Sequence, residues 1–215
     1  MRIRVLVADD HRMFREGLRV LLAGQDDLEI VGDAGDGLEA VKLARSLDVR
    51  VVVMDVEMPL LNGLEATRQL RAMLPDVRVV VLSMYSDRRF VIEALRAGAT
   101  GYLVKDCAFE ELAQAVRAVA AGQLYLPAGL TGIVVEESTR AVPDAESSAF
   151  TLLTARERQV LQLLAEGKST REAARLLEIS PKTVETHRAR IMSKVGLRSV
   201  AELARYAVRE GLTKA

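Results

Sequence analysis

The sequence predicts an α/β domain with a doubly wound, five-stranded parallel sheet, followed by a small all-α domain. Over the first 122 residues, short apolar and β-branched segments alternate with amphipathic segments of helical length, which is typical of βαβ units. Two of these segments, Val51–Val53 and Val79–Leu82, are apolar without interruption, as in strands covered on both faces. From Phe150 onward the pattern is helical throughout.

The strands and helices of the first domain follow from this alternation. We expect five strands, at Ile3–Ala8, Leu28–Asp33, Val49–Met54, Val77–Ser83 and Gly101–Val104. We expect helices between and after them, at Arg12–Ala23, Gly37–Ser46, Gly63–Met73, Arg89–Ala97 and Phe109–Ala121. Gly98 and Gly122 suit helix C-termini, where a left-handed residue is favoured.

A polar segment with weak periodicity separates the two domains. We therefore assign residues 1–122 to the first domain, 123–149 to a linker and 150–215 to the second domain, with a short helix in the linker at Leu130–Glu137. Thr154 with Glu157 has the spacing of a capping box, and Ser180 before Pro181 that of a helix start. The helices expected in the second domain are Ala155–Glu166, Thr170–Leu177, Pro181–Val195 and Val200–Glu210.

Charge is divided unevenly along the chain. The net charge is zero, but residues 150–215 hold 13 Lys and Arg against 7 Asp and Glu, and residues 1–149 hold 17 against 23. This asymmetry suggests two different partners, although ordinary surface scatter is the alternative. The lone Cys107, the absence of a signal-peptide pattern and the absence of an apolar run near ~20 residues predict a cytoplasmic protein without membrane contact.

Acidic residues stand where two of the expected strands end. Asp9 and Asp10 close the first strand and Asp55 closes the third, so all three lie at the carboxyl edge of the sheet, where open α/β folds build their sites. Such a group suits Mg²⁺, and one carboxylate can act as a nucleophile toward phosphorus. Ser83 ends the fourth strand and Lys105 follows the fifth. Each residue alone has a simpler reading, such as a helix N-cap, but their joint placement favours a phosphoryl-acceptor site.

These residues lie in motifs that resemble the receiver domain of two-component response regulators: VLVADDH, VVVMDVEMPLLNG, VVVLSMY and GYLVKD. The resemblance implies a sheet in the order 2-1-3-4-5 and phosphorylation by a sensor histidine kinase. It implies a Mg²⁺ site made by Asp9, Asp10, Asp55 and the backbone carbonyl of Glu57. It also implies a phosphoryl site made by Asp55 as acceptor, Ser83, Lys105 and the aromatic switch residue Tyr102. We interpret His11 as a surface or capping residue.

The second domain contains two expected helices joined by the short segment Glu178–Ser180, which fits a helix-turn-helix. On Pro181–Val195, an apolar face with Val184 and Ile191 packs inward, and the opposite face is polar and partly basic. That outer face suits the major groove of DNA, and a solvated surface without a partner is the alternative.

Two further motifs are LTARERQVL, at Leu153–Leu161, and AEGKSTREAARLLEISPKTVETHRARIMSKVGLRS, at Ala165–Ser199. With them, the chain from about Phe150 to Leu212 resembles the LuxR-type helix-turn-helix of the NarL/FixJ response regulators. The resemblance implies phosphate contacts from Lys182, Thr183, Arg188 and Arg190. It places Glu185, Thr186 and Ala189 opposite the bases of double-stranded DNA. For Glu185, a solvated charge is the slightly favoured alternative. Apolar residues of the last helix that the small domain does not bury would form a homodimer contact.

Together these features predict a transcription regulator that is switched by Mg²⁺-dependent phosphorylation of Asp55, and not an enzyme. One alternative keeps the DNA binding but makes it independent of phosphorylation. The other is a phosphatase with an aspartyl-phosphate intermediate, in which Glu57 would act as general acid.

Overall fold

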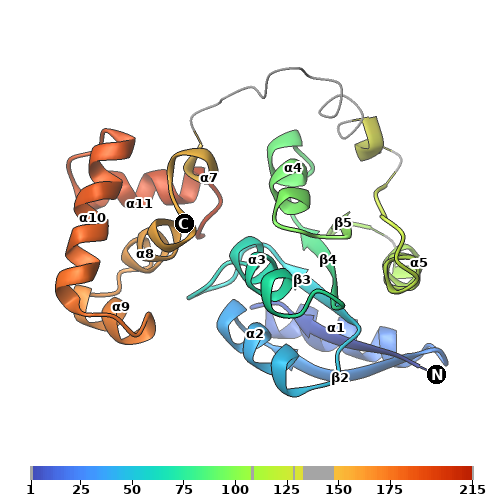
Figure 1. Cartoon of the computed structure of the whole chain (residues 1–215). Coiled ribbons are helices and arrows are strands. Elements are labelled where there is room, and N and C mark those ends of the chain that lie inside the picture. The colour runs from blue at the N-terminus through green and yellow to red at the C-terminus, as the bar shows by residue number, and fades with distance from the viewer. Residues whose placement is uncertain (1, 108, 128, 133–147, 215) are drawn as a thin grey trace. The chain divides into compact units, whose positions relative to one another are not determined.

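The computed structural model describes residues 2–107, 109–127, 129–132 and 148–214. The chain divides into two compact units, one built on the N-terminal sheet and one built from the C-terminal helices (Figure 1).

The first unit contains a five-stranded parallel sheet in the order β2-β1-β3-β4-β5, which confirms the predicted fold class and strand order. The strands are β1 (Ile3–Ala8), β2 (Leu28–Ala34), β3 (Val51–Asp55), β4 (Arg78–Ser83) and β5 (Gly101–Val104).

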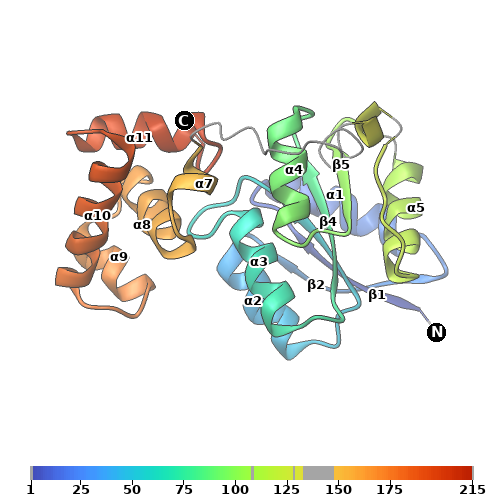
Figure 2. The ribbon, with the colours of Figure 1, turned by 45° about the horizontal axis from the view of Figure 1, so that its top comes forward.

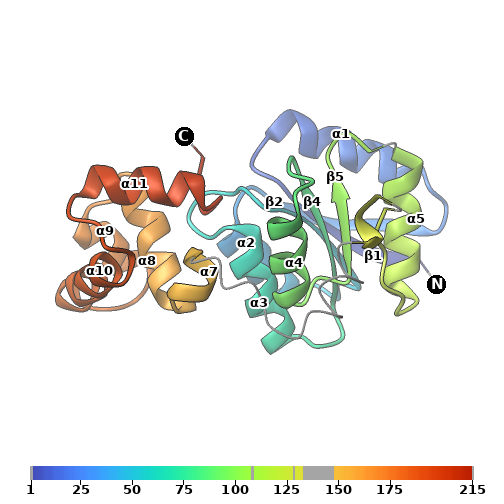
Figure 3. The same ribbon diagram turned by 90° about the horizontal axis from the view of Figure 1, so that it is seen from above.

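Helices cover both faces of this sheet. They are α1 (Arg12–Ala23), α2 (Gly37–Ser46), α3 (Gly63–Met73), α4 (Arg88–Arg96) and α5 (Phe109–Ala120). Helices α1 and α5 lie on one face, and α2, α3 and α4 lie on the other (Figure 3). Val5 and Val53 of the sheet pack with Leu22 of α1 and Val116 of α5 on one face. Leu6 points to the opposite face, because side chains alternate along a strand, and it is equally buried.

Several element boundaries of the first unit differ from the sequence prediction by one or two residues, and three of these differences have an identifiable reason. Strand β3 extends to Asp55, because this residue still pairs in register with Leu82 of β4. Strand β2 likewise extends to Ala34, which pairs with Ala8. Helix α4 begins at Arg88, because the Asp87 side chain accepts the amides of Arg89 and Phe90 as an N-cap.

The beginning of the predicted linker is attached to the sheet. The Tyr102 amide donates to the Tyr125 carbonyl at 3.0 Å, and the Tyr125 amide donates to the Thr100 carbonyl at 3.0 Å. Tyr125 therefore lies along the outer edge of β5. Of the helix expected at Leu130–Glu137, residues 130–132 belong to a helical segment at 129–132, and the remainder falls outside the described residues.

The second unit contains α7 (Ala149–Leu152), α8 (Ala155–Ala165), α9 (Thr170–Leu176), α10 (Pro181–Val195) and α11 (Val200–Arg209), which Figure 2 shows from a second direction. The capping box at Thr154 forms as predicted, and a second capping box forms at Ser169. Ser180 caps α10, and Pro181 is its first residue. Helix α7 was not predicted. Reciprocal Ser148–Thr151 bonds hold it, and its four residues are too few to give a periodic pattern.

The core of the second unit joins α8 to each of its longer neighbours. Leu161 of α8, Ala173 of α9, Ile191 of α10 and Leu203 of α11 are all fully buried in one cluster. In the part of the chain that the structure describes, every helix is too short or too polar to cross a membrane.

The backbone approaches itself closely at Gly63, the first residue of α3. Its amide donates to the Val56 carbonyl, and a Cβ atom at this position would lie 1.8 Å from the Asp55 carbonyl oxygen. Glycine is thus required where the chain returns past the end of β3.

We expect Gly63→Ala to lower the free energy of unfolding by about 1–3 kcal/mol, because the methyl group must displace the Asp55 peptide. Urea unfolding measures this change. The matched control is Gly17→Ala in α1, where a Cβ has no neighbour within 4 Å and helix propensity raises stability by about 0.5–1 kcal/mol. Equal stability of the two variants would contradict the proposed close approach.

Candidate functional site

The carboxyl ends of β1 and β3 bring the acidic residues together. Asp9 follows β1 and is 1% exposed, and Asp55 ends β3 and is 3% exposed. Asp10, next to Asp9, is partly exposed. Buried carboxylates of like charge repel one another, so this arrangement requires a cation between or beside them.

Lys105 supplies positive charge to this site from the loop after β5. Its Nζ lies 2.7 Å from Asp9 Oδ2 and 2.9 Å from Asp55 Oδ2, and 5.0 Å from the centre of the Phe14 ring. Burial acts to lower the pKa of Lys105, but the charges and hydrogen bonds of Asp55 and Asp9 outweigh burial and raise that pKa. Lys105 therefore stays protonated and bridges the two carboxylates.

His11 also faces the carboxylates. Of the surface or capping role expected for it, it takes the surface one: it is exposed, and it occupies the N-cap position of α1 without making a side-chain cap hydrogen bond. Its Nδ1 lies 3.0 Å from Asp10 Oδ1 and 3.4 Å from Asp9 Oδ1.

The donor set at this edge fits a hard divalent cation. Asp9, Asp10, His11 and Asp55 each offer one ligand atom, and these atoms lie within 4.8 Å of one another. Three of the four residues are carboxylates, which Mg²⁺ prefers to nitrogen or sulfur donors. The residues present therefore fit Mg²⁺.

Ser83 ends β4 and Tyr102 lies within β5, and both are completely buried. The Ser83 hydroxyl accepts a hydrogen bond from the Tyr85 amide at 3.1 Å. The Tyr102 hydroxyl donates to the Tyr85 carbonyl at 2.6 Å. Burial raises the pKa of Tyr102 to about 12, against an opposing hydrogen bond with Ser83, so this hydroxyl remains a donor at neutral pH.

Tyr85 connects these groups to Glu57. Its hydroxyl donates to Glu57 Oε1 at 3.0 Å, and its ring stacks on Phe90 with centroids 4.4 Å apart. The Glu57 amide points toward Asp55 Oδ1 at 3.4 Å. Sequence reasoning gave no role to Tyr85 or Phe14, because each contact joins segments that are distant in the chain.

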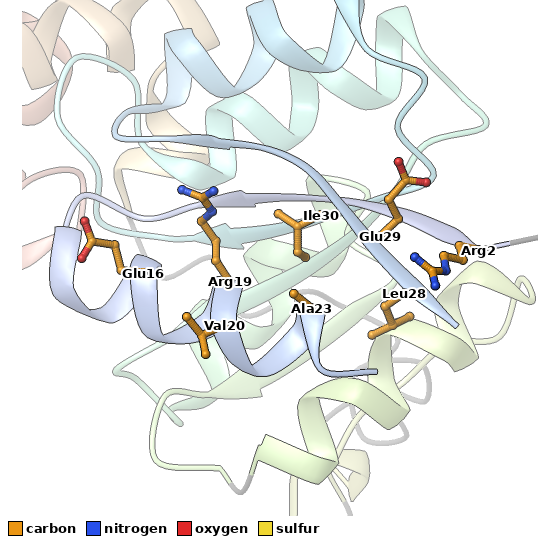
Figure 4. A pocket seen from close by; sticks show the side chains of 8 residues that line it. All are labelled: Arg2, Glu16, Arg19, Val20, Ala23, Leu28, Glu29 and Ile30. Carbon is orange, nitrogen blue, oxygen red and sulfur yellow. The ribbon is translucent and has the colours of Figure 1, made fainter. Parts of the chain in front are cut away.

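A surface hollow of about 640 Å³ lies away from these residues, between α1 and the edge strand β2 (Figure 4). Val20, Leu28 and Ile30 contribute apolar surface, and Arg2 and Arg19 add charge. None of the predicted site residues lines it, so it takes no part in the acidic site.

In the second unit, α9 and α10 form the expected helix-turn-helix. Ala173 and Ala174 are buried between the helices, as are Val184 and Ile191 on the inner side of α10. The exposed residues of α10 include Lys182, Glu185, Thr186, Ala189 and Arg190, while Thr183 and Arg188 are half-buried. The outer face is therefore polar and carries the positive charges of Lys182 and Arg190.

Two hydroxyls on α10 take part in local hydrogen bonds. Thr183 Oγ1 lies 2.8 Å from the Ser180 hydroxyl, and the Thr186 hydroxyl donates to the Lys182 carbonyl at 3.0 Å.

On the last helix, Leu203 and Ala207 are buried in the core, while Val200 and Val208 are exposed. Ala201 is also exposed and Ala204 is half-buried, so α11 keeps apolar side chains at the surface of this unit.

Glu157 ties the start of α8 to the end of α10. Its carboxylate accepts from the Thr154 amide at 2.8 Å and from Lys194 Nζ at 2.6 Å. Burial acts to raise the pKa of Glu157, but the bonds from Lys194 and Thr154 prevail and lower it. One buried carboxylate thus caps one helix and holds the position of another.

Known families match both units. The family described as "Response regulator receiver domain" matches residues 5–117, and the family described as "Bacterial regulatory proteins, luxR family" matches residues 151–207. The response regulator GacA of Pseudomonas viridiflava is 41% identical over 213 residues, which is 99% of each chain.

Solved structures extend this similarity to the fold. The response regulator ChrA of a heme-sensing two-component system is 33% identical, with a TM-score of 0.53 over 98% of each chain. A structure of two RcsB dimers bound to two parallel DNAs is 25% identical, with a TM-score of 0.59 over 96% of this chain and 98% of that chain.

We expect Lys105→Met to lower the free energy of unfolding by about 3 kcal/mol, because it leaves Asp9 and Asp55 as uncompensated buried charges. Added Mg²⁺ should restore much of the loss, since it would replace the missing positive charge. Urea unfolding with and without Mg²⁺ measures both effects. The exposed Lys42→Met serves as control, and a Lys105→Met protein as stable as this control would refute the bridge.

The lowered pKa of Glu157 predicts a pH dependence of stability. Its contribution is fully present above the ordinary pKa of 4.5 and is lost as the pH falls through the lower folded value. Glu157→Gln should therefore reduce the loss of stability between about pH 7 and pH 3, measured by urea unfolding of the whole chain. Glu185→Gln, on the exposed face of α10, is the control variant. A Glu157→Gln profile identical to wild type would exclude this role.

Proposed function

Because the chain belongs to the response regulators that join a receiver domain to a LuxR-type DNA-binding domain, we propose that phosphorylation of Asp55 controls its binding to DNA. The protein is a transcription regulator of a two-component system. The observation that carries the proposal is the buried Asp55, held 2.9 Å from Lys105 beside two further carboxylates. We assign residues 1–122 to the receiver, 123–149 to the linker and 150–215 to the DNA-binding domain.

In the proposed reaction, an Asp55 carboxylate oxygen attacks the phosphorus of a phosphohistidine on the sensor kinase. The new bond joins this oxygen to phosphorus, the phosphorus–nitrogen bond breaks, and the imidazole leaves and takes up a proton. Lys105 is close enough to move from Asp55 to the phosphoryl oxygens, and the Ser83 hydroxyl donates to the same group.

Asp9, Asp10 and Asp55 would hold Mg²⁺, together with the backbone carbonyl of Glu57. Bound there, the ion supplies positive charge that offsets the phosphoryl oxygens and the surrounding carboxylates. His11, interpreted from the sequence as a surface or capping residue, faces Asp9 and Asp10 and is a neighbour of this site.

In this proposal, Ser83 and Tyr102 transmit the effect of Asp55 phosphorylation away from the site. Both contact the main chain of Tyr85, so movement of the Ser83 hydroxyl toward a phosphoryl group alters the loop that holds Tyr102. A complete switch, from 1:99 to 99:1, requires roughly 5.5 kcal/mol of differential stabilisation.

The outer face of α10 is the proposed DNA-reading surface. We assign phosphate contacts to Lys182, Thr183, Arg188 and Arg190, and base-facing positions to Glu185, Thr186 and Ala189. The net positive charge of residues 150–215 supports this assignment.

The exposed pair Val200 and Val208 on α11 supports a homodimer in the active state, as in the DNA-bound RcsB dimers. A cytoplasmic location completes the proposal.

The deciding experiment is footprinting of genomic DNA fragments with wild type and Asp55→Asn, each with and without a small-molecule phosphodonor and Mg²⁺. We expect the phosphodonor to strengthen binding by wild type and to leave Asp55→Asn unchanged, because the amide cannot accept the phosphoryl group. Equal binding under all four conditions would favour a regulator that is independent of phosphorylation. Catalytic turnover of a soluble phosphomonoester by wild type would favour the phosphatase instead.

A further inference from the structure

We propose that Arg15 is a positioning residue for the acidic site and fixes the peptide that joins Asp9 to Asp10. This inference rests on the metal site proposed above. No predicted role involved Arg15, which lies in the amphipathic helix α1 and bonds to Asp33 and to the Asp9 carbonyl.

The Arg15 guanidinium binds two segments at once. Its Nε lies 2.9 Å from Asp33 Oδ2, near the end of β2, and its Nη1 donates to the Asp9 carbonyl. The side chain is only 16% exposed. A planar guanidinium donates in fixed directions, so its anchor on Asp33 determines where the Nη1 donor points.

Every other polar group of Asp9 is also held. Its amide donates to the Ala34 carbonyl at 3.1 Å, Oδ1 accepts from the His11 amide at 2.8 Å, and Oδ2 pairs with Lys105. The carbonyl bound by Arg15 belongs to the same planar peptide as the Asp10 amide. Arg15 therefore sets the orientation from which the Asp10 side chain enters the site.

Arg19 provides a matched control one turn further along α1. Its Nη1 lies 2.9 Å from Asp33 Oδ1, and its side chain is 49% exposed. Within the described residues it has no hydrogen bond to Asp9. Arg15 and Arg19 thus share the Asp33 anchor, and only Arg15 reaches the acidic site.

Charge and position predict opposite effects on cation binding. Arg15 repels a cation at the acidic site, so removing its charge alone would strengthen Mg²⁺ binding. Loss of the hydrogen bond from Arg15 to the Asp9 carbonyl would instead weaken Mg²⁺ binding. Arg15→Lys keeps the charge but loses the two-directional geometry, so this variant isolates the effect of position.

The test is calorimetric titration of Mg²⁺ into the unphosphorylated full-length protein, with urea unfolding of each variant as a check on folding. We expect Arg15→Lys and Arg15→Gln to raise the Mg²⁺ dissociation constant roughly 10-fold or more, as for other residues that orient metal ligands. Arg19→Gln should bind Mg²⁺ like wild type. At saturating Mg²⁺, phosphorylation of Arg15→Lys by a small-molecule phosphodonor should approach the wild-type rate.

Wild-type affinity in both Arg15 variants would overturn the inference and leave the proposed metal site intact. An equal loss in Arg19→Gln would also overturn it, because the effect would then come from Asp33 or from general charge. Absence of Mg²⁺ binding by wild type would overturn the metal site itself, and this inference with it.

Discussion

The receiver depends on one interaction, the bridge that Lys105 makes between the buried carboxylates of Asp9 and Asp55. Two such charges in a dry interior are unfavourable unless a cation compensates them. Asp9 leaves β1 and Lys105 leaves the edge strand β5, with β3 and β4 between them. The site is thus a property of the whole sheet: the strand order and register must be correct before these three groups can meet.

Much of this arrangement could be predicted from local pattern. β-branched segments located the strands, and the acids directly after β1 and at the end of β3 located the site edge. Ser180 and Pro181 gave the start of α10, because a cap and a first-turn proline are local signals. The bridging of two carboxylates by Lys105, and the Tyr85–Glu57 hydrogen bond, could not be predicted, because each depends on how distant segments pack.

In the second unit, too, local features could be predicted and contacts between distant segments could not. Its longer helices carried clear periodicity, and their ends differ from the predicted ones by a single residue at most. Helix α7 gave no signal, since four residues complete barely one turn. Glu157 was predicted as a capping residue, and its second partner Lys194 lies 37 residues away on another helix. In both units, the sequence predicted the helices, strands and caps, and the contacts between distant segments followed only from tertiary packing.

Tyr102 uses its two donors for two different parts of the receiver. Its hydroxyl binds the Tyr85 carbonyl in the loop after β4, and its amide binds the Tyr125 carbonyl in the segment that leaves α5. Rotation of the ring about χ1 breaks the first bond without disturbing the second. The loop can therefore rearrange while the exit segment stays docked. The Tyr102 amide proton can exchange with solvent only when the Tyr125 carbonyl releases it, and loss of the bond to Tyr85 alone leaves it protected.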